Sequence, residues 1–151
     1  MNIDYIKTIL FLLAAVFPVL LILRSSSNNY RKFLSKILLV HLVLLFIVTF
    51  KLHHLLRSLF NIPNTITYIL GAIPFIILFT KHRAELKTKE FLLLITSIFL
   101  LASAVIIDLL SDGKLLIIPD NDNIEEIFRI AGAWVWLLFN LLLYSRLKKM
   151  K

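Results

Sequence analysis

The stretch FLLLITSIFLLASAVIIDLL, residues 91–110, indicates what kind of fold this chain adopts. Its apolar run is interrupted only by Thr96, Ser97, Ser103 and Asp108. A helix needs about 20 mostly apolar residues to cross a hydrocarbon core about 30 Å thick. The stretch therefore predicts a helix that spans a membrane.

The composition of the whole chain agrees with this prediction. Of its 151 residues, 60% are hydrophobic and 17% are charged, whereas soluble domains average about 45–50% and about 25%. The chain contains no cysteine, which excludes disulfide frameworks, thiolate metal sites and cysteine nucleophiles. We therefore expect an integral membrane protein.

Four further apolar runs are candidates for spans. The first is interrupted by Lys7 and Pro18, and it lacks a small-x-small cleavage site, which favours a retained helix over a signal peptide. The complete set of predicted spans is 6–23, 37–56, 62–80, 91–110 and 124–144. The intervals between them are shorter than the roughly 50 residues of a separate soluble domain. The predicted fold is therefore all-α, a single domain over residues 1–151 that forms an integral membrane bundle of five transmembrane helices.

Basic residues are distributed unequally between the loops of this five-span arrangement. The intervals 24–36 and 81–90 and the tail from Ser145 hold 12 of the 17 Lys and Arg residues, all on one side. An excess of Lys and Arg in short loops marks the cytoplasmic side of a membrane protein. The N-terminus is therefore predicted outside and the C-terminus in the cytoplasm.

The formal net charge of +8 follows from the same distribution. Basic residues at helix ends orient the chain and attract anionic lipid headgroups. Membrane lipids and a second membrane protein are therefore the expected partners, and nucleic acid is not. The missing cysteines, the charge asymmetry and the lack of a transit peptide favour the inner (cytoplasmic) membrane of a bacterium as the location.

Ionisable residues collect at the predicted outer ends of three spans. The candidate polar site consists of Asp108, Arg129, Glu125, Glu126, Lys51, His53 and His54. A short loop joins the last two spans, so they should be antiparallel neighbours with Asp108 and Arg129 at similar depth. Charges at such depth are costly and normally pair or line a wet cavity. We therefore predict a buried unit of Asp108 and Arg129, in which Glu125 shares the guanidinium and Lys51 competes for Asp108.

Two interpretations of this candidate site stay open. In the structural one, Glu125 and Arg129 form an i,i+4 pair, and the carboxylates in the first turn suit the helix dipole. In the functional one, the charges form a working polar site near the outer leaflet. A stripe along the last span predicts its interior face, used either for close packing or for a substrate path: Arg129, Ala133, Trp136, Asn140 and Tyr144.

Metal and cofactor motifs do not match. The segment that starts at Asp120 begins like a calcium loop, but Glu125 stands where an EF-hand needs glycine. His41 and His54 are predicted on one helix with opposite azimuths, so they do not form an opposed haem pair. We expect no metal, no cofactor and no catalytic residue. The apolar loop 114–119 is too short to span and is predicted to lie in the outer interface.

Three functional classes fit these features. An accessory, regulatory or immunity-type membrane subunit that acts through helix contacts is favoured, because no catalytic motif is found. A small transporter or ion-conducting protein would need polarity that continues from the outer site toward the cytoplasm. A lipid-modifying enzyme, the least favoured class, would need His53 or His54 to converge with Asp108 and Glu125.

Overall fold

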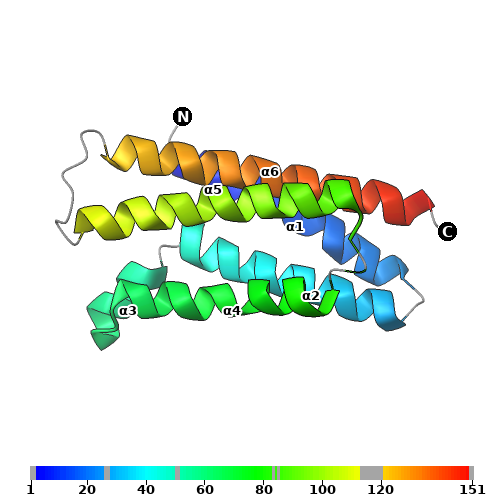
Figure 1. The fold of residues 1–151 in the computed structure, drawn as a ribbon, viewed down its shortest axis with the longest axis horizontal. Helices are drawn as coiled ribbons and strands as arrows, with labels where there is room; N and C mark the ends of the chain where they lie inside the picture. Colours follow the sequence, from blue (N-terminus) through cyan, green and yellow to red (C-terminus); the bar gives the residue numbers. More distant parts are fainter. Residues whose placement is uncertain are drawn as a thin grey trace.

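A computed structural model describes residues 3–25, 28–49, 52–82, 84, 86–112 and 121–149 of the chain. Its elements in chain order are α1 (Ile3–Arg24), α2 (Asn28–Leu44), the π-helical turn η1 (Leu45–Thr49), α3 (Leu52–Phe60), α4 (Asn64–His82), α5 (Thr88–Asp112) and α6 (Asn121–Lys149). The regular structure of the described residues is helical throughout, which confirms the predicted all-α class (Figure 1).

Four helices are long and apolar enough to cross a membrane, namely α1, α4, α5 and α6. They correspond to the predicted spans 6–23, 62–80, 91–110 and 124–144. Three of them extend beyond the apolar run at both ends, whereas α4 begins two residues later than predicted and ends two residues later. Helices of this length and apolarity are typical of a membrane protein.

The second predicted span, 37–56, is wrong in its boundaries. The helix begins at Asn28, and η1 continues it to Thr49. Residues 52–56 belong instead to the separate helix α3. Lys and Arg are good helix formers, so the helix starts well before the apolar residues do, and apolarity alone misplaces its beginning.

The turn between α3 and α4 has a defined cap. Asn61 has a positive φ of 56°, the left-handed conformation that commonly ends a helix. Its N–H donates to the carbonyl of Arg57 at 3.0 Å, and the N–H of Ile62 donates to that of Leu56 at 3.4 Å. Pro63 then precedes the first residue of α4. The cap lets the chain reverse, so that α4 packs beside α2.

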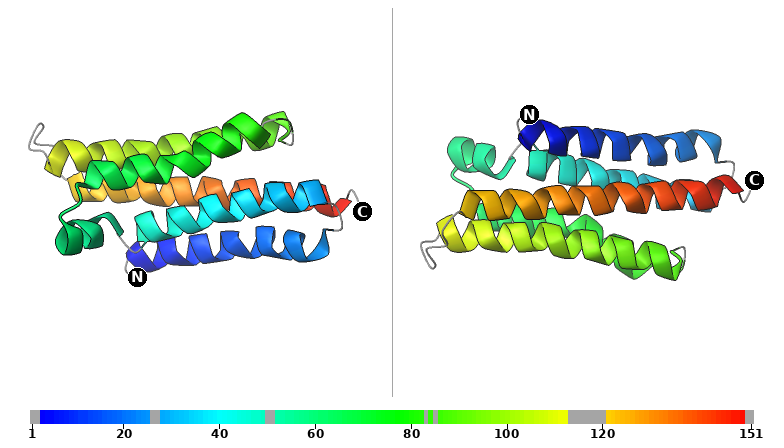
Figure 2. Two further views of the ribbon diagram at one scale, coloured as in Figure 1. Left: turned by 90° about the horizontal axis from the view of Figure 1, so that it is seen from below. Right: turned by 90° about the horizontal axis from the view of Figure 1, so that it is seen from above.

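The long helices pack in the cyclic order α4, α2, α1, α6, α5 (Figures 1 and 2). The α5–α6 pair has the most extensive contact, followed by α1–α6 and α1–α2, whereas α4 touches α5 only lightly. The bundle is therefore well closed except at the seam between α4 and α5.

Gly132 explains why α5 and α6 approach so closely. A Cβ atom at this position would lie 2.7 Å from Cγ of Leu101. The Ser97 hydroxyl donates to the Gly132 carbonyl at 2.9 Å. Small residues and interhelical hydrogen bonds of this kind hold helices together where the hydrophobic effect does not act.

Burial divides each helix into an inner and an outer face. Trp136 is the largest fully buried side chain, and Phe11 and Phe139 are fully buried as well. Large apolar side chains such as Leu13 and Ile69 are more than half exposed. An apolar outer surface is what a bundle surrounded by lipid requires.

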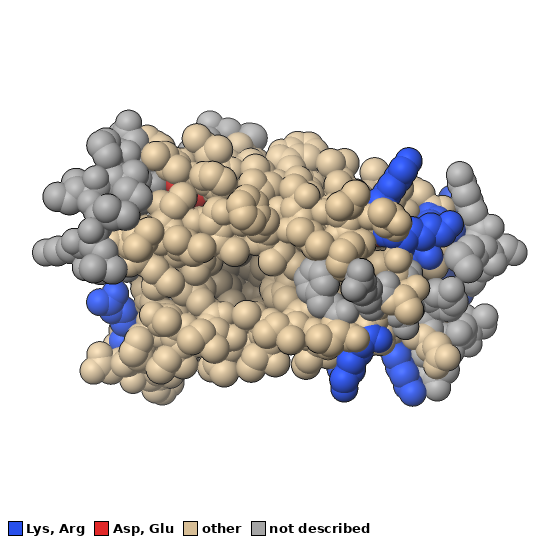
Figure 3. Space-filling model, viewed as in Figure 1, with Lys and Arg blue, Asp and Glu red and all other residues tan. Residues whose placement is uncertain are grey.

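Charged side chains gather at the two ends of the bundle, and Figure 3 shows most of the visible Lys and Arg at one of them. At this basic end, α1, α4 and α6 end while α2 and α5 begin. Among the described residues, the exposed basic side chains of this end are Arg24, Arg31, Lys32, Lys36, Lys81, Lys87, Lys89 and Lys148. The other end, where α1, α4 and α6 begin, is called the paired end below. The predicted interfacial loop 114–119 lies outside the described residues.

Candidate functional site

Four helices bring polar side chains together at the paired end. The members of this paired cluster are Lys7 of α1, Tyr68 of α4, Asp108 of α5 and Glu125, Glu126 and Arg129 of α6. Asp108, Glu125 and Arg129 are each less than 9% exposed. Charges this deep in a membrane bundle are stable only when they pair with one another or meet water.

Arg129 is the centre of the α6 part of the cluster. It forms a close ion pair with Glu125 and a second one with Glu126, whose Oε1 lies 3.2 Å from Nη1. The spacings of four and three residues place all three side chains on one helix face. The predicted contact of Glu125 with the guanidinium is therefore present, whereas the ion pair of Asp108 with Arg129 stays a prediction.

Lys7 connects α1 to this group. Its side chain is fully buried, and its Nζ lies 2.5 Å from Oε2 of Glu126. From the sequence, Lys7 is only an interruption in the first apolar run. A buried lysine one turn inside a span does signal an ion pair, but the partner follows only from the contact of α1 with α6.

Tyr68 connects α4 to α5. Its hydroxyl donates to Oδ2 of Asp108 at 2.7 Å. Asp108, Arg129 and Glu125 all lie close enough to act electrostatically on this hydroxyl. Asp108 and Arg129 are thus both buried at the same end with Tyr68 as a shared neighbour, and sequence reasoning missed Tyr68 because its partner lies 40 residues away.

The remaining residues of the candidate site are placed differently. His54 is exposed on α3 rather than buried with Asp108 and Glu125. Lys51 and the side chain of His53 lie outside the described residues. The working-site interpretation of the seven residues stays a prediction.

A second polar contact lies in the middle of the bundle. The indole N–H of Trp136 donates to Nδ1 of His41 at 2.8 Å, and both side chains are fully buried. Because Nδ1 accepts, Nε2 carries the proton of the neutral imidazole. One turn further along α6, the Asn140 side chain donates to the Trp136 carbonyl at 2.8 Å. Among the described residues there is no cluster of metal-ligating side chains.

The basic end has its own buried ion pair. Glu90, only 1% exposed, receives the Arg146 guanidinium at 2.6 Å from Nε and 2.8 Å from Nη2. It also accepts the backbone N–H of Lys87 at 3.1 Å, which caps the first turn of α5. Nearby, Arg24 donates to the Tyr144 hydroxyl at 3.3 Å. These contacts tie α5, α6 and α1 together.

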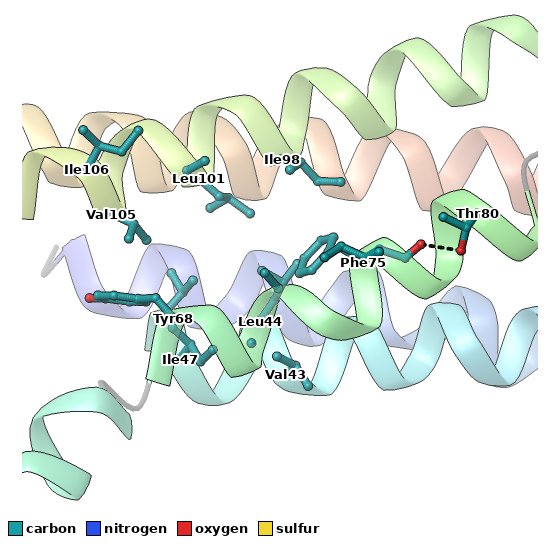
Figure 4. Close-up of a pocket in the computed structure, with 15 residues that line it drawn as sticks. Val43, Leu44, Ile47, Tyr68, Phe75, Thr80, Ile98, Leu101, Val105 and Ile106 are labelled. Atoms are coloured by element: carbon teal, nitrogen blue, oxygen red, sulfur yellow. Dashed lines mark hydrogen bonds between the residues drawn. The ribbon is translucent and has the colours of Figure 1, made fainter. Parts of the chain in front are cut away.

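A lateral groove of about 490 Å³ follows the open seam between α2–η1, α4 and α5 (Figures 3 and 4). Its walls are apolar, and Phe75 and Leu101 face it from opposite sides. Figure 4 places Tyr68 at one end and Thr80 at the other. A Cβ atom at Gly71 would collide with the Ile47 side chain, so glycine is what allows α4 to lie directly on η1 beneath this groove.

A family assignment adds to this geometry. Residues 5–143 match the family model described as a domain of unknown function, DUF8692, and the chain therefore belongs to this family. No curated protein and no solved structure matches the chain. The matched range includes both the paired cluster and the groove.

Proposed function

We propose that the protein crosses the membrane five times, with α2 and η1 as its second span. The helical stretch 28–49 is about 33 Å long at 1.5 Å per residue, against about 30 Å of hydrocarbon. Its Arg31, Lys32 and Lys36 belong to the basic end, where the headgroups would lie. By the positive-inside rule the basic end is cytoplasmic, so the N-terminus lies on the outer side of the membrane. The membrane in this proposal is the inner membrane of a bacterium.

Within that membrane, we propose that the protein is an accessory, regulatory or immunity-type subunit that acts through helix contacts with another membrane protein. Its buried polar groups support a non-catalytic role, because they join helices of the same chain. Lys7–Glu126 joins α1 to α6, Tyr68–Asp108 joins α4 to α5, and Arg146–Glu90 joins α6 to α5.

The packing of α4 is the observation that carries this proposal. In the most apolar 18-residue stretch of α4, only 12% is buried inside the bundle, against 28–39% in the same kind of stretch in α1, α5 and α6. This stretch is also the least apolar of the four. Its outward face, here called the α4 stripe, presents the exposed side chains Ile66, Ile69, Leu70 and Ile73. These residues follow helical spacing and form one continuous surface. A weakly apolar helix with so little packing of its own gains van der Waals contact from a partner helix.

Photo-crosslinking in intact cells tests the proposal. A photo-reactive phenylalanine analogue placed at Ile69 should give a crosslink whose peptide, identified by mass spectrometry, comes from a transmembrane helix of a second protein. Leu13 of α1, which is 51% exposed, is the matched control and should give lipid adducts. Lipid adducts alone at both positions would overturn the proposal.

An ion-conducting protein is the second candidate, and the buried centre of the bundle favours it. His41, Trp136 and Asn140 continue the polarity of the paired cluster along α6 toward Tyr144. Vesicles that contain the protein and a trapped pH-sensitive dye should then show proton flux that His41→Phe abolishes. Wild-type vesicles as tight as protein-free ones would eliminate this candidate.

A further inference from the structure

The groove along the α4–α5 seam has a shape that selects its occupant. Its volume is about 490 Å³. From Tyr68 to Thr80 it follows α4 for about 18 Å, at 1.5 Å per residue. A helix about 10 Å across would need about 1,400 Å³ over that length, more than the ≈ 1160 Å³ of empty space in the groove and its open side, so the groove does not enclose a partner helix. A single flexible hydrocarbon chain is narrow enough.

The length of the groove and its open side fit a lipid chain that enters from one leaflet of the bilayer. Half of a hydrocarbon core is about 15 Å thick, close to the 18 Å between the groove ends. The groove therefore matches the depth of one leaflet. Because its walls are apolar and it opens sideways at a seam where α4 and α5 barely touch, lipid can enter from the bilayer without crossing a polar barrier.

The two ends of the groove differ in chemistry. At the Tyr68 end, the hydroxyl is turned away toward Asp108, so the ring closes the groove with an apolar wall. Two carboxylates, Asp108 and Glu125, and one guanidinium, Arg129, act electrostatically on the Tyr68 hydroxyl. This end does not favour a phosphate.

The Thr80 end meets the basic end of the bundle. Lys87 precedes α5 on the helix face that continues toward Ile98. Lys36 lies two turns before Val43 on the groove face of α2. Both lysines are exposed, and they come from the α2 and α5 sides of the groove. Exposed lysines at the membrane surface attract an anionic headgroup.

We propose that this groove binds one acyl chain of an anionic phospholipid from the leaflet at the basic end, with the phosphate held by Lys36 and Lys87. The groove and the α4 stripe overlap only in part. Tyr68, Gly71 and Phe75 line the groove from a different face of α4, whereas Ile76 and Thr80 continue the face of the stripe toward the basic end. The lipid completes the seam that the chain leaves open and holds α4 against α5.

Tryptophan fluorescence provides a local reporter for this site. The chain has two tryptophans. Trp134 is 51% exposed, whereas Trp136 is fully buried and its ring centroid lies 6.4 Å from that of Phe75, which lines the groove. The variant Trp134→Phe therefore leaves one reporter behind the groove wall, shielded from bulk lipid.

The experiment uses Trp134→Phe in phosphatidylcholine vesicles that contain a low, fixed fraction of dibrominated-chain lipid. Brominated phosphatidylglycerol should quench Trp136 more strongly than brominated phosphatidylcholine with the same chains. Lys36→Gln and Lys87→Gln together should reduce this preference about tenfold or more. The matched double variant Arg31→Gln and Lys89→Gln removes two exposed charges from the same end and should keep the preference.

A second variant tests the groove itself. Ala102 lines the groove and is exposed, so Ala102→Phe should fill it and reduce quenching by both brominated lipids while the helix content stays unchanged. Equal quenching by the two headgroups would overturn the proposal. It would also be overturned if the control double variant lost the preference as fully as the groove double variant. The same holds if Ala102→Phe left quenching unchanged, since a partner helix or bulk lipid would then account for the signal.

Discussion

Breaking the buried ion pair of Lys7 and Glu126 should lower the free energy of unfolding more when Glu126 is replaced than when Lys7 is replaced. Replacing Glu126 by leucine removes the carboxylate 2.5 Å from a fully buried ammonium. Breaking a buried pair from one side costs about 3–5 kcal/mol. Lys7→Met should cost less, about 1–2 kcal/mol, because Glu126 keeps Arg129 at 3.2 Å and its side chain is 18% exposed.

The double variant Lys7→Met/Glu126→Leu should be close to the wild type, within about 1 kcal/mol, since apolar replacement of a buried pair is often neutral. The resulting coupling energy should reach about 2 kcal/mol or more. The free energy of unfolding is measured in mixed micelles by raising the SDS fraction and following helix content by circular dichroism.

Exposed Lys32 supplies the control, because Lys32→Met at the opposite end should change the free energy of unfolding by less than about 0.5 kcal/mol. Additive losses in the double variant would refute the reasoning, as would a larger loss for Lys7→Met than for Glu126→Leu. Either result would mean that Lys7 draws its stability from contacts other than Glu126.

Three further outcomes are expected. Tyr68→Phe should lower the free energy of unfolding in the same titration by about 1.5–3 kcal/mol, and it should have little added effect in an Asp108→Ala background. Gly132→Ala should cost about 1–3 kcal/mol through its clash with Leu101, and Leu101→Ala should recover part of that loss; full stability of Gly132→Ala would mean that α5 and α6 adjust freely. The five-span topology predicts the labelling of single cysteines by an impermeant thiol reagent in intact cells. Labelling is expected at the exposed positions Thr65 and Asn123 and protection at the exposed positions Asn29, Thr88 and Ser145; labelling at Thr88 would contradict the topology.

Prediction from sequence worked where a property is local. The run 91–110 predicts α5 to within three residues at either end, because an apolar helix must match the thickness of the bilayer. The i,i+4 pair of Glu125 and Arg129 follows equally directly from helix geometry. The predicted boundaries of the second span were wrong because Arg31, Lys32 and Lys36 are helical without being apolar. The helix and the apolar run therefore cover different residues.

Membrane character, the helical class, the positions of four of the long helices and the concentration of charge near their ends were all determined by the sequence. These features depend on composition and on neighbours three or four residues apart. Only the tertiary structure decided that Lys7 meets Glu126, that Tyr68 meets Asp108 and that a groove separates α4 from α5. The first two contacts join residues 119 and 40 positions apart. Several helix orders in a lipid-facing bundle satisfy the same hydropathy, because lipid and helix surfaces are equally apolar. Packing of particular side chains, such as Gly132 against Leu101 and Gly71 against Ile47, is what selects one of those orders.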